Sequence, residues 1–307
     1  MSGRIGPYDY DESLELEFLS FTDMPVQNPF RVDEWNTFFD LPTNGTPFTS
    51  VKVKNNKVYL RGGANITLGA GAALYLFQGY YRGGKLTKII DNGNCITAVG
   101  GRCFYDNSNL TYVLLPAVTS VGYEVFDGCN SLLFISLALL TSGSPGTFAG
   151  CSSLTSAGVN LPSLITAGYA SFSGCTSLTS INLPSLVTIE YSAFYGCTGL
   201  TSIYFPNVIT VKDYSFIYAT SLASVSLPAA GTILDLSFAG CTSLTTISIP
   251  SCVALGHDPN NNNVFGGVTG RTITLTVPSA LMTCNGGNPD GDIQYLQANN
   301  TVTVITV

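Results

Sequence analysis

The feature of this sequence that most constrains its fold is a repeat of 22 residues between Phe104 and Pro250. Two successive units, LTSINLPSLVTIEYSAFYGCTG from Leu178 and LTSIYFPNVITVKDYSFIYATS from Leu200, align without a gap. Phenylalanine marks the period, with one spacing of 24 and a last spacing of 27, at positions 104, 126, 148, 172, 194, 216, 238 and 265. A fixed period of this length is typical of a solenoid, in which each unit forms one turn of a stacked array.

Each unit contains two apolar half-patterns. The first is L-x-x-I-x-L-P, as in residues 178–184, and the second is L-x-x-I-x-x-x-A-F-x-G-C, as in residues 186–197. Burying about six apolar side chains contributes roughly 9–18 kcal/mol per unit, whereas ordering the unit costs on the order of 30 kcal/mol. A single unit therefore cannot fold alone. The pattern predicts a mainly β repeat protein whose stacked units share one core.

The repeat unit resembles the leucine-rich repeats of the BspA-like (Treponema pallidum) type. Their pattern, L-x-x-I-x-I-P-x-x-V-x-x-I-x-x-x-A-F-x-x-C, matches residues 178–197. The resemblance covers residues 104–278 and implies a leucine-rich-repeat solenoid of about seven 22-residue coils. The pattern breaks at residues 143–146, and two residues are inserted near Ala157 and Gly158, where we expect a bulge or loop between coils. Such repeats are found in bacterial surface adhesins, protist surface proteins and virion proteins, so the resemblance implies binding without naming a ligand.

Three regions are expected. Residues 1–95 lack the 22-residue period and are predicted to form a β-rich docking and capping domain, with a hairpin whose loop is Asn55-Asn56. Residues 96–250 form the leucine-rich-repeat solenoid. Residues 251–307 are predicted to be a C-terminal cap with a strand over 272–278, one or two helical turns over 293–298 and a last strand over 301–307.

The charge distribution excludes several classes of partner. Eleven of the twelve Lys and Arg residues lie outside residues 104–250, and the net charge is −7. Binding to a phosphate backbone needs clustered cations, so we expect neither nucleic acid nor an anionic membrane as a partner. The sequence contains no run of 18 apolar residues, so no membrane-spanning helix is expected. The first 18 residues lack the apolar segment of a signal peptide, so no secretion signal is expected.

The chain has nine cysteines, five of which share one repeat position: Cys129, Cys151, Cys175, Cys197 and Cys241. We expect them to form a column of buried, reduced thiols beside the phenylalanines, because buried thiols behave as small hydrophobic groups. A disulfide scaffold is less favoured in a repeat array that has core enough, and no C-x₂-C pair indicates zinc. Cys95 and Cys103 could pair across a short loop, although we favour free thiols there.

Residues that might support catalysis do not form a recognisable set. The single histidine, His257, lies in an Asn-rich segment without a definable nucleophile or orienting partner. Asp290 and Asp292 have the D-x-D spacing of a calcium loop but none of its remaining ligands, so they indicate a turn. The sequence therefore predicts a protein that is not an enzyme, with no catalytic, cofactor or metal site.

The outward positions of L-x-x-I-x-L suggest a binding surface. They are aromatic in the first units and rich in Ser and Thr in the later ones, and the candidate ligand-binding residues are Tyr112, Phe134, Asn182 and Tyr204. Exposed aromatic side chains on a rigid sheet are good anchors for partners. Alternatively, the Ser and Thr columns only keep a strand surface soluble.

A second candidate surface lies near the phenylalanine column. Glu190 and Lys212 occupy equivalent positions in adjacent units and are predicted to form an ion pair. One position along, Tyr169 and Tyr191 are equivalent and are predicted to stack, with Tyr123 in the same column. These tyrosines form an aromatic strip suited to stacking on sugars.

Together these features suggest a non-enzymatic binding protein. We expect a phage virion protein, a tail or head fibre on the virion surface, whose repeat faces contact polysaccharide or protein on the host bacterium. Residues 1–95 would bind other virion proteins, and a homo-oligomer is left open. The alternative is a bacterial cell-surface or secreted adhesin of the BspA-like family.

Overall fold

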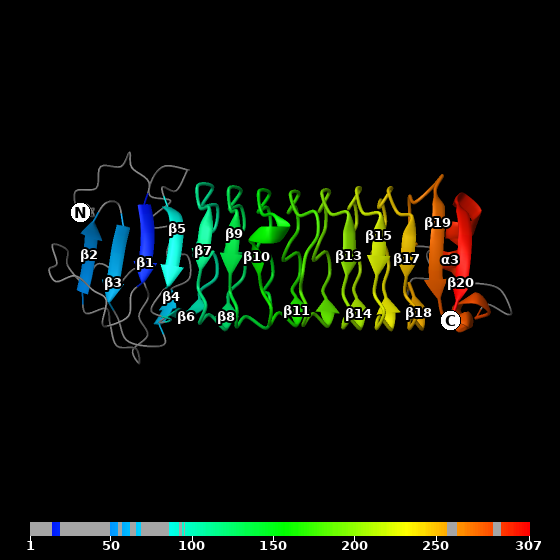
Figure 1. The fold of residues 1–307 in the computed structure, drawn as a ribbon, viewed down its shortest axis with the longest axis horizontal. Coiled ribbons are helices and arrows are strands. Elements are labelled where there is room, and N and C mark those ends of the chain that lie inside the picture. The colour runs from blue at the N-terminus through cyan, green and yellow to red at the C-terminus, as the bar shows by residue number, and fades with distance from the viewer. Residues whose placement is uncertain are drawn as a thin grey trace.

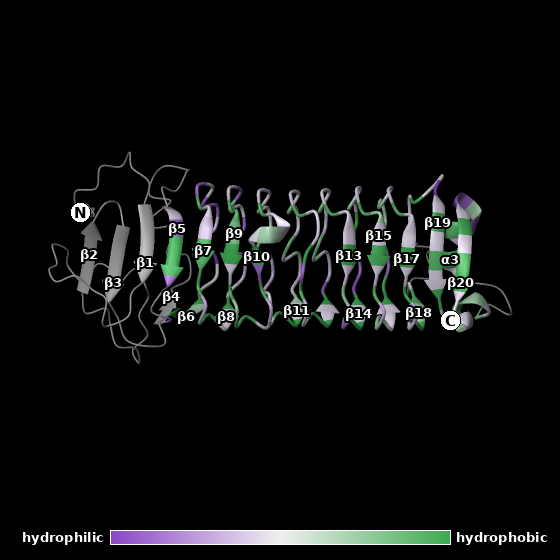
Figure 2. Ribbon diagram, viewed as in Figure 1, coloured by the Kyte–Doolittle hydropathy of each residue, from purple (hydrophilic) through white to green (hydrophobic). Residues whose placement is uncertain are grey.

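The computed structural model describes residues 14–18, 50–54, 57–61, 66–68, 86–91, 94, 96–256, 263–284 and 290–307. The chain forms a parallel β-solenoid of about eight turns, seen as a row of rungs in Figure 1. This confirms the predicted mainly β repeat fold. Hydrophobic residues recur in every rung, as Figure 2 shows.

One side of the solenoid is built from the first half-pattern and forms two sheets. The N-terminal sheet has the order β10-β9-β7-β5-β1-β3-β2, with β1 Leu14–Phe18, β2 Ser50–Lys54, β3 Lys57–Arg61, β5 Leu86–Asp91, β7 Tyr112–Leu114, β9 Phe134–Ser136 and β10 Val159–Asn160. The C-terminal sheet has the order β13-β15-β17-β19-β20, with β13 Ser202–Tyr204, β15 Ser224–Ser226, β17 Thr246–Ser248, β19 Thr272–Val277 and β20 Thr301–Thr306. We call the outward surface of these strands from β7 onward the first face.

The second half-pattern forms shorter strands on another side of each rung. One sheet has the order β4-β6-β8, with β4 Ile66–Leu68, β6 Ile96–Val99 and β8 Ser120–Val121. The other has the order β11-β12-β14-β16-β18, with β11 Thr166–Ala167, β12 Thr188–Ile189, β14 Thr210–Val211, β16 Thr232–Ile233 and β18 Ala254–Leu255. Their pairing is parallel and in register, for example Thr188 with Thr210, so the repeat period sets the position of each strand.

The strands β1, β2 and β3 extend the seven-stranded sheet of the first face toward the N-terminal end. The predicted hairpin is confirmed, because β2 pairs antiparallel with β3 and Lys54 lies opposite Lys57. Strand β1 pairs in parallel with both β3 and β5, and β5 pairs with β7 of the repeat region. Sheet pairing thus runs through the predicted division at residue 95, and the separate docking domain stays a prediction.

The inserted residues form the predicted irregularity between rungs. Ser156–Gly158 is a short 3-10 helix that leads directly into β10. The Ser156 hydroxyl donates to Ser180 O and accepts from Ser180 N–H at 2.8 Å, so a side chain replaces strand pairing here. Gly158 is required, because a Cβ would lie 1.8 Å from Leu133 O of the preceding rung.

The core contains the predicted column of phenylalanines. All eight rings are buried, and neighbouring centroids lie 5.1–5.9 Å apart. The thiols at the repeat cysteine position are also buried, and each donates to a phenylalanine carbonyl of the preceding rung. Cys197 Sγ, for example, lies 3.1 Å from Phe172 O. The expected column of free thiols is therefore confirmed for these five residues, while Cys95 lies outside the described residues.

Each of the seven phenylalanine turns from Phe104 to Phe238 has left-handed residues two positions before and two positions after the phenylalanine. In one rung these are Ser192, with φ of 57°, and Gly196, with φ of 64°. This backbone directs alternate N–H groups along the solenoid axis: Phe194 N–H donates to Ser215 O at 2.8 Å and Gly196 N–H to Ile217 O at 2.9 Å. The turns therefore carry an inter-rung ladder of their own, and the glycine before cysteine serves the left-handed backbone.

A cap closes the C-terminal end. It consists of β19, the 3-10 helix Ser279–Met282, α3 Gly291–Asn299 and β20. The helix is longer than predicted and buries Ile293 and Leu296 against the core. Within the described residues, no helix is both long enough and apolar enough to cross a bilayer.

Candidate binding surfaces

The N-terminal part of the first face carries an aromatic pair. Tyr112 of β7 and Phe134 of β9 are register partners, and their rings stack at 4.6 Å between centroids with 13° between planes. Both side chains are half-buried, and the neighbouring Leu133 is exposed. The structure thus brings these two predicted residues together in one apolar patch.

The other two predicted residues of the first face lie further along the solenoid. Tyr204 of β13 is 64% exposed and lies opposite Ser226 of β15. Asn182 is exposed at the equivalent position of the preceding rung, which forms no strand on this side. From β13 onward the outward positions are mostly hydroxyl side chains in strict register, such as Ser202, Ser224 and Thr246. The first face therefore has an aromatic patch at one end and a hydroxyl-rich area with one exposed tyrosine at the other.

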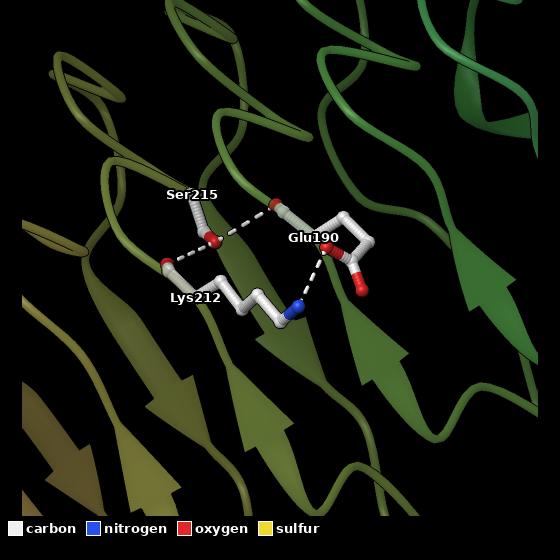
Figure 3. A network of polar contacts seen from close by, with 3 residues as sticks. All are labelled: Glu190, Lys212 and Ser215. Atoms are coloured by element: carbon white, nitrogen blue, oxygen red, sulfur yellow. Dashed lines mark hydrogen bonds and ion pairs between the residues drawn. The ribbon is translucent and has the colours of Figure 1, made fainter.

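The predicted ion pair joins two adjacent turns. Lys212 Nζ lies 2.9 Å from Glu190 Oε2, and the Ser215 hydroxyl donates to the backbone carbonyls of both residues (Figure 3). The hydrogen bond that the Lys212 ammonium donates to Glu190 raises the pKa of Lys212. Both side chains are about a third exposed, so the pair contributes at most ~1 kcal/mol to stability.

The predicted stack of Tyr169 on Tyr191 is wrong: among the ring contacts of the described residues, these two do not pair. Lys212 instead places its ammonium 5.1 Å from the centre of the Tyr191 ring, a cation–π geometry. The ammonium is held there by its ion pair with Glu190. Tyr169 and Tyr191 remain 57% and 42% exposed, so both stay available to a ligand.

Three exposed tyrosines of the same turns were not predicted: Tyr195, Tyr214 and Tyr218. Tyr218 replaces the repeat glycine, with φ of 60°, and Ala219 replaces the cysteine. The Tyr218 ring packs edge-on against Tyr195 at 5.8 Å and 85°. The sequence signal for this change is that the unit starting at Leu200 has Tyr218-Ala219 where five of the other units have Gly-Cys.

In the described part of the chain, no group of three or more His, Cys, Asp or Glu residues could hold a metal ion. Asp290 forms the N-cap of α3 by accepting from Asp292 N–H, which gives the D-x-D spacing a structural role. His257 lies outside the described residues.

Comparison with known families identifies the repeats. The family described as BspA type leucine rich repeat region matches residues 77–166 and 141–263 in six copies, which together span more than half of the chain. The chain belongs to this BspA-type family. A comparison with curated protein sequences found no significant match.

Several solved structures are similar to this BspA-type chain. A leucine rich cell surface protein from Faecalibacterium prausnitzii A2-165 is 18% identical, with 83% of this chain and 90% of that chain covered and a TM-score of 0.39. The T. pallidum leucine rich repeat protein is 19% identical, with 84% and 94% covered and a TM-score of 0.37. The pneumococcal vaccine antigen PcpA is 13% identical, with 98% and 91% covered and a TM-score of 0.42.

Proposed function

We propose that this BspA-type protein is a non-enzymatic binding protein that acts at an exterior surface. The observation that carries the proposal is the outward-facing aromatic side chains on a rigid, nearly uncharged solenoid. Tyr112 and Phe134 form a stacked pair on the first face, and Tyr204 projects 64% exposed from the same face. Aromatic anchors of this kind dominate recognition because they bury large area with little loss of side-chain freedom.

The ligand class that fits best is polysaccharide of a bacterial surface, with surface protein as the alternative. Sugar rings present apolar C–H faces that stack on aromatic rings, and their hydroxyls bond to polar groups beside them. The later rungs of the first face supply such groups, including Ser202, Ser224 and Thr246. Lys212 is the only cation within residues 104–250, which favours a ligand that is not strongly anionic.

The setting we favour is the virion surface, as a phage tail or head fibre. Buried free thiols in a column, such as Cys151, Cys175 and Cys197, are typical of chains that fold in a reducing compartment. Phage particles assemble inside the bacterial cell, where this condition holds. Membership of the BspA-type family favours the second candidate, a bacterial surface adhesin. Mass spectrometry of purified particles and of cell-envelope fractions distinguishes the two settings.

Binding is tested with full-length variants on isolated cell-surface polysaccharide and on whole cells. Changing Tyr112 and Phe134 together to Ser is expected to weaken binding at least tenfold, a loss of about 1.4 kcal/mol or more. The matched control changes Tyr169 and Tyr191 to Ser on the turn surface. Loss of binding in the control alone would reassign the site to the turns, and unchanged binding in both folded variants would refute these surfaces.

In the virion setting, residues 1–95 contact other virion proteins. Hydrogen exchange of the full chain, free and bound to the particle, should then show new protection within residues 1–95 and not within 104–307. Protection confined to the repeats would reverse the assignment.

A further inference from the structure

The last strand of the solenoid leaves a hydrogen-bonding edge open. Strand β20 is the outermost strand of its sheet and pairs with β19. Thr301 N–H donates to Arg271 O at 2.8 Å, and Val307 N–H donates to Val277 O at 3.1 Å. Because polar backbone groups alternate in direction along a strand, residues 301, 303, 305 and 307 face β19. The N–H and C=O groups of Val302, Val304 and Thr306 therefore point to an edge that no described residue occupies.

Within the described part of the chain, this edge lacks the features that normally prevent strand pairing. Residues 301–307, TVTVITV, contain no charge and no proline. Natural edge strands are commonly protected by lysine, proline, bulges or a covering segment. The opposite end of the same array provides the comparison, since the outer strand β2 contains Lys52 and Lys54 (Figure 1). The two ends differ, and the C-terminal one is suited to accept a strand.

The side chains of β20 define what can pair with it. Thr301, Thr303 and Ile305 are exposed on the first face, whereas Val302 and Val304 are half-buried against the core. A matching strand needs apolar side chains on the core side and uncharged ones on the outer side. Strand β20 of a second copy supplies Val302 and Val304 on the core side and Thr301, Thr303 and Ile305 on the outer side.

We propose that two copies of this chain pair through their β20 strands, antiparallel and about a two-fold axis. The same surface patch then meets itself, as closed two-fold symmetry requires. The axis stands perpendicular to the sheet, so both copies turn their first faces to the same side. The contact joins the two C-terminal sheets into one continuous sheet.

The register follows from which groups are free. Val304 pairs with Val304 of the second copy, and Val302 pairs with Thr306 of the second copy, so that each free N–H meets a free C=O. Thr303 then lies opposite Ile305 of the second copy on the outer side. A slip of one residue would place outward side chains opposite inward ones, which the half-buried valines disfavour.

Electrostatics does not oppose this contact, although each copy has a net charge of −7. In residues 263–284 and 290–307 the only charged side chains are Arg271, Asp290 and Asp292. The two aspartates lie at the start of α3 and not on β20. A second copy therefore meets an uncharged strand, and the mutual repulsion of the two chains is carried by distant groups.

Sedimentation velocity of the 307-residue chain over a range of concentrations tests the proposal and should show a dimer. Val304→Pro removes an N–H that the β19 pairing does not use, and proline is tolerated at such edge positions. It should raise the dimer dissociation constant at least tenfold and lower the unfolding midpoint at high dilution much less than Thr303→Pro does. Thr303→Pro is the contrast, because it removes an N–H that bonds to β19 and should destabilise the cap itself.

A charge exchange tests the register without proline. Thr303→Lys combined with Ile305→Lys places like charges opposite each other and should abolish the dimer. Thr303→Lys combined with Ile305→Glu places opposite charges together and should restore it. A wild-type chain that stays monomeric at all concentrations would overturn the proposal, as would a dimer that none of these variants weakens. If the edge instead accepts a strand of a different protein, this chain alone would sediment as a monomer, which overturns the proposed dimer.

Discussion

Single residues of the phenylalanine column contribute strongly to stability because each ring packs between two others. Phe194 lies 5.1 Å from Phe172 on one side and 5.1 Å from Phe216 on the other. Phe194→Ala is therefore expected to lower the free energy of unfolding by roughly 3–5 kcal/mol. Urea unfolding measures this, with the exposed Tyr204→Ala as the control that changes stability by less than about 0.5 kcal/mol. Equal losses in both would mean that the assigned repeat register is wrong.

The five buried repeat cysteines should not react with thiol reagents in the folded protein. Burial raises the pKa of Cys197 and of Cys241 to about 12, so neither forms the reactive thiolate near neutral pH. Cys284 is exposed and should react with a thiol reagent before the buried repeat cysteines do. After denaturation, with oxidation blocked, titration should approach the nine cysteines of the sequence. Five or fewer free thiols would contradict the reduced column.

At the scale of elements, the left-handed turns should respond to substitution differently from the helix. Gly196 has φ of 64° and open space around its missing Cβ, so Gly196→Ala costs only backbone strain, about 1–2 kcal/mol. Gly291 also has open space, but it lies in the first turn of α3. Gly291→Ala should stabilise by about 0.5–1 kcal/mol. Thermal unfolding of the two variants should shift the midpoint in opposite directions, and a shift in the same direction would contradict the turn assignment.

The C-terminal cap contains a carboxyl group whose ionisation opposes folding. Desolvation raises the pKa of Asp292 to about 6, and the nearby Asp290 and Asp235 act in the same direction. The folded state thus binds this proton more tightly than the unfolded state, in which the pKa is near the ordinary value of 3.8. This contribution to stability is fully present below pH 4 and is lost as the pH rises through 6.

Asp292→Asn should remove that dependence. The amide oxygen can still accept from Val264 N–H, as the carboxylate oxygen does at 2.7 Å. The variant is expected to be more stable than the wild type at pH 7, by on the order of 1–2 kcal/mol, and similar to it at pH 4. Unfolding midpoints at the two pH values measure this. A larger loss at pH 7 than at pH 4 would contradict the assigned role of desolvation.

Most elements were predictable from sequence because each repeat unit places the same strands and the same buried side chains at the same positions. Phe194 and Lys212 could be placed from their position in the period alone, and the Glu190–Lys212 pair was confirmed. The period says nothing about side chains that leave the common pattern. The contact of Lys212 with Tyr191, and the place of Tyr218 at a glycine position, depend on the particular neighbours in one pair of rungs. Candidate sites lie among such departures, so their composition was less predictable than the fold.

For the whole molecule, the parallel ladders make each rung depend on its two neighbours. A rung bonds to the next through strands such as β12 and β14 and again through the turn, as with Phe194 N–H and Ser215 O. Few contacts reach beyond the adjacent rung, so stability approximates a sum of rung and interface terms. The two ends, where one neighbour is missing, are therefore the places where the array can pair with a further strand.

The ladder direction also has a mechanical consequence. Because the inter-rung hydrogen bonds run along the solenoid axis, tension applied between the two ends loads them in series rather than together. The rungs should then peel one at a time, and each releases 22 residues, an extension of about 70 Å. A tether built this way lengthens in small steps under pull instead of failing in one event.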